Sequence, residues 1–139
     1  MITKLDVFNR WAGEWRSLAA WGAPLHINLT IKPYNGQRLL GWAYPHRGDC
    51  VVRLTGDLPR DLATALHEMA HLAAPSYVMH ELPWRQMFAR AAGEALGEDP
   101  GVIELDVDLF DLDKQVMRMV YRWLERSGQH AVLSALGVL

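Results

Sequence analysis

Hydrophobic residues near the start of the chain recur with the period of an α-helix. Between residues 4 and 21 they are spaced three or four apart. They are Leu5, Phe8, Trp11, Trp15 and Leu18. Gly22 follows as a C-cap residue. We therefore predict an amphipathic helix over residues 4–21, which docks on a sheet through its tryptophans.

The period then changes from helical to two. Residues 25–32 alternate between apolar and polar side chains, the pattern of a half-buried strand. Asn35-Gly36 follows, and this dipeptide is a strong hairpin signal. Further strands are expected over residues 37–44 and 50–54. Short turns between consecutive strands favour an antiparallel three-stranded meander.

Helical periodicity returns in the second half of the chain. The predicted helices cover about 58–73, 83–97 and 112–126, followed by a short apolar helical tail over 131–139. Asp111 is expected to cap the 112–126 helix. Residues 102–109 alternate again but are rich in aspartate, so they form either a strand or an extended acidic loop. The combined pattern predicts an α+β fold.

Composition limits the class of protein. The 139 residues are half hydrophobic and carry a net charge of −2 at pH 7, as expected for one globular domain. A single cysteine, Cys50, excludes internal disulfides and a cysteine-based zinc knuckle. No apolar run reaches the roughly 18 residues of a membrane span, and the N-terminus lacks the apolar core of a signal peptide. We therefore expect a cytoplasmic protein.

Residues 67–71 read HEMAH and lie within the predicted 58–73 helix. On a helix, residues four apart are separated by about 6 Å along the axis and about 40° around it. His67 and His71 therefore project from one face, where they can bind one metal ion. Glu68 lies about 100° round from His67, beside the metal rather than among its ligands. This is the two-ligand and general-base arrangement of zinc hydrolases.

A catalytic zinc needs a third protein ligand. His80 follows His71 by nine residues, after a loop in which the chain can turn back towards the metal. Glu81, the next residue, is a second candidate ligand. Glu94, on the next predicted helix, would give a two-His-one-Glu site instead. We favour His80.

The chain resembles the SprT-like (Spartan-type) metallopeptidase domain over roughly residues 1–97. The matching elements are the HEMAH run, His80 with Trp84 four residues later, Gly41-Trp42-Ala43, the strand-like run Cys50–Leu54 and the helix start at Leu58-Pro59. Where the family has glycine after its third histidine, this chain has Glu81. The resemblance implies a zincin-like fold, with an N-terminal helix, a small sheet, the HEMAH helix, a second ligand-bearing helix and C-terminal helices. Residues 102–139 would be a helical extension of the same domain.

The chemistry expected of such a site is peptide-bond hydrolysis. Zinc held by three imidazoles keeps one position for water and lowers the pKa of that water towards about 7. Glu68 would take the proton of the water and deliver it to the leaving amine. Tyr44, His46 and Tyr77 are candidate donors to the oxyanion. Trp84 is expected to pack behind the ligands.

The expected partner is a protein or peptide substrate, which zincin-type peptidases hold along an edge strand. Two other interpretations stay open: a gluzincin-like regulatory peptidase that uses Glu94, and a non-catalytic metal-containing interaction module. Arg118, Arg122 and Arg126 are spaced by four and form either a phosphate-facing stripe or a solvated helix face. The net charge favours the solvated face over DNA association.

Overall fold

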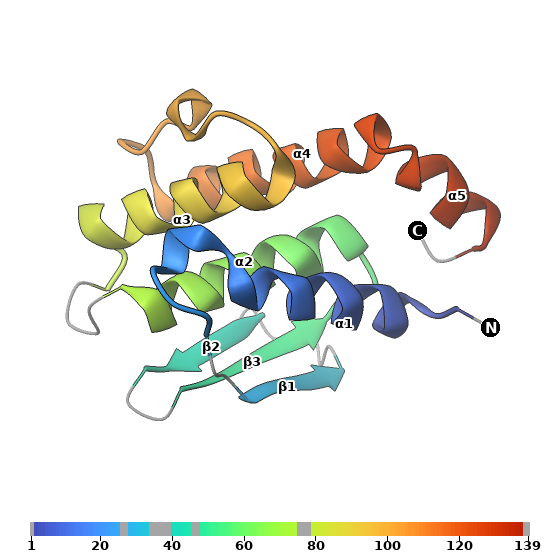
Figure 1. Cartoon of the computed structure of the whole chain (residues 1–139), viewed down its shortest axis with the longest axis horizontal. Coiled ribbons are helices and arrows are strands. Elements are labelled where there is room, and N and C mark those ends of the chain that lie inside the picture. Colours follow the sequence, from blue (N-terminus) through green and yellow to red (C-terminus); the bar gives the residue numbers. More distant parts are fainter. Residues whose placement is uncertain (1, 26–27, 34–39, 46–47, 75–78, 138–139) are drawn as a thin grey trace.

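Helix α2 (Leu58–Ala73) is the central element of the structure (Figure 1). Ten of its 16 residues are buried, and it contacts α1, α3, α4, β2 and β3. A helix that is apolar around most of its circumference needs neighbours on several sides. The HEMAH run therefore lies in the middle of the molecule.

The structure, a computed structural model, describes all residues except 1, 26–27, 34–39, 46–47, 75–78 and 138–139. Within these limits the fold is α+β. The α-helices are α1 (Lys4–Glu14), α2, α3 (Leu82–Leu96), α4 (Leu109–Arg126) and α5 (Gln129–Ala135). The strands are β1 (Asn28–Pro33), β2 (Gly41–Tyr44) and β3 (Asp49–Leu54). Short 3-10 helices are η1 (Trp15–Ser17), η2 (Ala19–Trp21) and η4 (Pro100–Val102). No helix in the described part of the chain could span a membrane.

The sheet has the order β1-β3-β2, so the predicted antiparallel meander is wrong. Strand β2 pairs antiparallel with β3, and this pair packs against α2. Strand β1 pairs parallel with β3 on the other side. The reason lies in burial: Cys50 and Val52 have no exposed surface, so β3 takes the central position. The predicted Asn35-Gly36 turn lies outside the described residues.

Helix α1 is shorter than predicted. A capping box at Thr3 and Asp6 starts it, but the α-helix ends at Glu14, and the chain continues through η1 and η2. The aromatic residues of this region pack on α4, where the Trp11 and Trp123 ring centroids lie 4.7 Å apart. The expected tryptophan docking on the sheet is thus replaced by docking on a helix.

Helices α2 and α3 begin and end close to the predicted positions. Asp57 caps α2 by accepting from the Arg60 N–H, and a proline lies in the first turn. Helix α3 ends at Gly97, which has a φ of 68° that glycine adopts without strain. Local signals are strong at these ends, and tertiary packing agrees with them.

The C-terminal part packs on the HEMAH helix. Helix α4 contacts both α2 and α3. Its N-cap is Asp108, which accepts from the Asp111 N–H at 2.9 Å, so the helix starts three residues before the predicted position. Residues 103–108 form no helix or strand, so the extended acidic loop is the correct alternative. This loop connects η4 to α4 (Figure 1).

Candidate metal centre

Three histidine side chains converge between α2 and the start of α3. His67 and His71 are one turn apart on α2, and His80 lies two residues before α3. Nε2 of His80 lies 2.9 Å from Nε2 of His71 and 3.2 Å from Nε2 of His67. One ligand atom from each ring lies within 4.8 Å of those of the other two. The structure therefore brings together the three histidines that the sequence singles out.

The spacing of these nitrogens fits a metal ion. Two nitrogens bound tetrahedrally to zinc at about 2.05 Å lie about 3.3 Å apart. A neutral imidazole has a single N–H, so the hydrogen on His80 can point at only one of its two neighbours. The remaining lone pairs face each other. A cation at the centre of the three Nε2 atoms removes that repulsion.

Asp113 lies behind His67. Its Oδ1 accepts from Nδ1 of His67 at 2.8 Å. With Nδ1 protonated, Nε2 of His67 carries the lone pair and faces the other two rings. Burial by itself lowers the pKa of His67, but Asp113 more than compensates and the pKa is raised. Sequence reasoning missed Asp113, because this residue falls in the first turn of the predicted 112–126 helix and belongs to no motif that links it to the HEMAH run.

The other two imidazoles are held neutral. Burial lowers the pKa of His71 to about 3, with further lowering from His67 and His80. Burial, followed by the charge of His67, also lowers the pKa of His80. Metal binding requires the deprotonated ring nitrogen, so both rings are in the ligand form at neutral pH.

The ring of Trp84 packs against all three histidine rings. Its ring centroid lies 4.6 Å from that of His67, 4.8 Å from that of His71 and 4.7 Å from that of His80. It is stacked on His71, at an interplanar angle of 17°, and has no exposed surface. Phe88, one turn later, contacts His67. Trp84 therefore restricts the rotation of all three rings, as expected for a residue behind the ligands.

Glu68 is next to His67 in sequence, but its carboxylate is not one of the grouped donor atoms. Its side chain is turned towards β2. A Cβ atom placed at Gly41 would lie 2.9 Å from Oε2 of Glu68. Only 5% of Glu68 is exposed, and this burial raises the pKa of the carboxyl to about 7. A carboxyl with such a pKa can accept and release a proton near neutral pH.

Comparison with protein-family models, curated proteins and solved structures gives no match.

Glu94, the alternative third ligand, is engaged elsewhere. Its Oε2 accepts from the Ala19 N–H at 2.7 Å and its Oε1 from the Ala20 N–H at 2.9 Å. It lies about ten residues, or about 15 Å, further along α3 than Trp84. Its carboxylate thus caps the N-terminal end of η2, where backbone N–H groups lack helical partners.

Of the remaining candidates, two are exposed and two lie outside the described residues. Glu81 is the exposed N-cap residue of α3 and makes no side-chain capping bond. Tyr44 is 43% exposed at the end of β2. His46 and Tyr77 lie outside the described residues.

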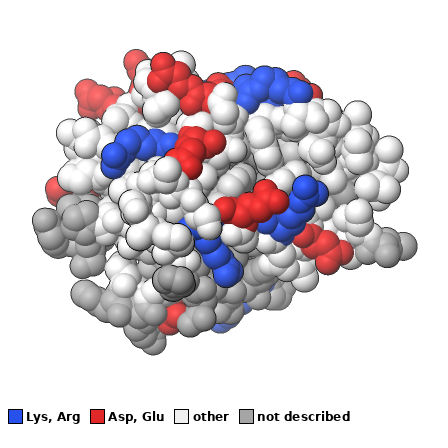
Figure 2. Space-filling view, viewed as in Figure 1, with Lys and Arg blue, Asp and Glu red and all other residues white. Residues whose placement is uncertain are grey.

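The positive charges of two α4 arginines are partly neutralised by the carboxylate of Glu98. Arg122 contacts Oε1 of Glu98 at 2.9 Å, and Arg126 contacts Oε2 of the same residue at 3.4 Å. Arg126 also donates to the Leu96 carbonyl. Figure 2 shows acidic and basic side chains next to each other on the face drawn. These pairings favour the solvated-face interpretation of the stripe.

Proposed function

We propose that the protein is a zinc-dependent endopeptidase of SprT-like type. His67, His71 and His80 are the metal ligands and Glu68 is the general base. The observation that carries the proposal is the convergence of three Nε2 atoms, with distances of 2.9 and 3.2 Å from His80 to its neighbours. The next residue after His67 supplies a buried carboxyl with a pKa of about 7.

Zinc suits this set of donors. Three neutral imidazoles without a thiolate are a common catalytic zinc set and leave one coordination position open. When bound there, the metal supplies Lewis-acid polarisation of a carbonyl group and of a water molecule. Glu68 is not among the grouped donors, so its carboxylate is available for proton transfer. It takes a proton from the attacking water and delivers it to the leaving amine.

The sheet supplies a place for the substrate. Strand β2 is an edge strand of the described sheet, and its residue Gly41 lies against Glu68. An extended peptide that pairs with β2 through main-chain hydrogen bonds would thus run past the general base. This geometry supports a protein or peptide substrate rather than a small molecule. A cytoplasmic location and a single domain over residues 1–139 belong to the same proposal.

The first test combines metal analysis with cleavage of an unfolded protein such as casein. The wild type should bind one zinc ion and cleave. Glu68→Gln should bind zinc equally well, because residue 68 is not a ligand, and its cleavage should fall at least about 1,000-fold. Wild-type protein without zinc, or undiminished cleavage by Glu68→Gln, refutes the proposal.

A non-catalytic metal site is the second candidate, and the burial of Glu68 is the observation that favours it. A closed fourth coordination position would leave Glu68 as a structural residue. Cobalt substitution separates the two candidates. An inhibitor with a hydroxamate group should change the visible spectrum of the cobalt protein if the position is open, and leave it unchanged if it is closed.

A further inference from the structure

His80 differs from the other two candidate ligands because no helix fixes its backbone. It lies before α3 and follows Met79, a non-glycine residue with a φ of 49°. Single residues other than glycine adopt this left-handed region at a cost that neighbouring contacts must offset. The position of the His80 ring therefore depends on contacts from outside its own segment.

Arg85 makes such a contact. Its Nε donates to the carbonyl oxygen of His80 at 2.7 Å. Its Nη1 donates to the carbonyl of Leu105 at 2.8 Å and also to the carbonyl of Val107. One guanidinium thus joins the ligand residue to the loop before α4. Bonds from a charged donor are about twice as strong as neutral ones.

The chain from Leu105 to Asp113 also contacts a second candidate ligand, His67. Asp113, eight residues after Leu105, accepts from Nδ1 of His67. Immediately before Leu105 the chain is also fixed to α4. The side chain of Gln115 binds both the N–H and the carbonyl of Glu104, at 2.8 and 2.9 Å. Residues 105–113, which we call the 105–113 segment, therefore contact His67 directly and His80 through Arg85.

We infer that the 105–113 segment is part of the metal site, and that Arg85 is a positioning residue that sets the place of His80. The inference rests on the proposed metal site, though not on proteolysis. Substitution of Arg85 should lower metal affinity even though its side chain is not a ligand. Loss of groups that hold zinc ligands in place lowers affinity about 10- to 100-fold.

Arginine is required for this bridge because of its shape. A planar guanidinium directs several N–H groups at once towards carbonyls on two sides, whereas a lysine ammonium is a point charge. Arg85→Lys keeps the charge but should not restore the bridge to both His80 and the loop. This comparison distinguishes hydrogen bonding from a general effect of positive charge near the site.

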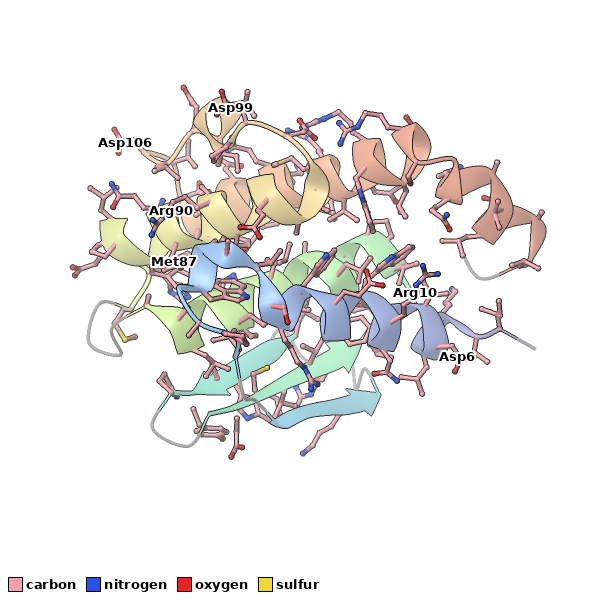
Figure 3. The ribbon with its side chains drawn as sticks, viewed as in Figure 1. Asp6, Arg10, Met87, Arg90, Asp99 and Asp106 are labelled. Carbon is pink, nitrogen blue, oxygen red and sulfur yellow. The ribbon has the colours of Figure 1, made fainter. Side chains whose placement is uncertain are left out.

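The experiment measures zinc affinity by competition with a chromophoric chelator, in wild type, Arg85→Met, Arg85→Lys, Asp113→Asn and the Arg85→Met/Asp113→Asn double variant. Controls are Arg90→Met on the same helix and Asp106→Asn within the segment. Both residues are exposed, and Figure 3 places them at the outer surface of α3 and of the following loop. Thermal unfolding of each metal-free variant checks that the fold persists. If Arg85→Met does not fold, the cycle is made with Arg85→Lys.

The expected result is a fall of at least about 10-fold for each Arg85 variant and for Asp113→Asn. The controls should stay within about 2-fold of wild type. Because the two residues act through one segment, the double variant should lose less than the product of the single effects. Unchanged affinity in the Arg85 variants, full rescue by lysine, or strictly multiplicative losses overturn the inference.

These outcomes are separable from the fate of the proposed function. Zinc binding and cleavage by the wild type, together with unchanged affinity of the Arg85 variants, would remove the inference and leave the peptidase standing. Zinc binding without cleavage would remove the peptidase, while the affinities would still decide the role of Arg85. A wild type that binds no zinc overturns both.

Discussion

Oδ1 of Asp113 lies 2.8 Å from Nδ1 of His67, although 46 positions separate the two residues. The contact joins the first turns of α4 to the HEMAH helix. It assigns the proton of His67 to Nδ1 and leaves Nε2 free to face His71 and His80. A carboxylate from the C-terminal half thus determines which nitrogen the motif presents to a metal.

The first prediction concerns this proton. In metal-free protein at about pH 9, long-range proton–nitrogen NMR should show His67 as the tautomer with hydrogen on Nδ1, because Asp113 accepts from that atom. Asp111→Asn, a control on the same helix, should leave the tautomer unchanged. A dominant Nε2–H form of His67 in the wild type contradicts the contact.

The second prediction follows from Glu68. Its pKa is raised from 4.5 to about 7 by burial, so between these pH values the folded state binds more protons than the unfolded state. The stability of metal-free protein therefore contains a contribution from Glu68 that is lost as pH rises from about 4.5 to about 7. Glu68→Gln removes this loss. At pH 8 it should be more stable than wild type by about 1–3 kcal/mol.

Urea unfolding of both metal-free proteins at pH 5 and pH 8 measures the effect. The stability difference between variant and wild type should grow with pH over this range. A difference that stays constant would mean that Glu68 titrates at its ordinary pKa.

The parts of the fold that the sequence predicted are those with local causes. Helix α2 begins at a capped proline turn, and α3 ends at a glycine with positive φ. The sheet order was missed because a turn signal constrains only strands that are consecutive in sequence. The burial of β3 on α2, which places β1 and β2 on its two sides, is a tertiary effect.

The site likewise has parts with local causes and parts that depend on tertiary packing. The spacing of His67 and His71 on one helix face is a local property, and His80 was favoured because a third ligand is required. Asp113 and Arg85 reach the site only through the packing of α4 and the preceding loop on α2 and α3. One signal was present: zinc-binding histidines donate their second N–H to a carboxylate, a backbone carbonyl or a water molecule, and residues 104–113 offered several carboxylates. The sequence could not select Asp113 among them.

The third prediction separates His80 from Glu94. His80→Ala removes one of three grouped donors and should lower zinc affinity at least about 100-fold. Glu94→Gln should leave zinc affinity unchanged, because this carboxylate binds the Ala19 and Ala20 amides instead. Its expected effect is a loss of about 1 kcal/mol in unfolding free energy. Chelator competition and urea unfolding of the two variants give both quantities, and a large zinc effect at position 94 would restore the gluzincin-like alternative.

The fourth prediction concerns the space beside Glu68, the proposed general base. A Cβ at residue 41 would lie 2.8 Å from the carbonyl oxygen of Val51 and 2.9 Å from Oε2 of Glu68. Gly41→Ala should therefore displace the Glu68 carboxylate, and overpacking of this kind costs about 1–3 kcal/mol of stability. Cleavage should fall about 100-fold, because a misplacement of about 1 Å is enough for such a loss. Zinc content should not change, since the three imidazoles are not touched.

Gly13→Ala is the matched control. Nothing lies within 4 Å of its added Cβ, so the free energy of unfolding should rise by about 0.5–1 kcal/mol through a more stable helix α1. Full activity of Gly41→Ala would mean that Glu68 does not work from the position it occupies against β2.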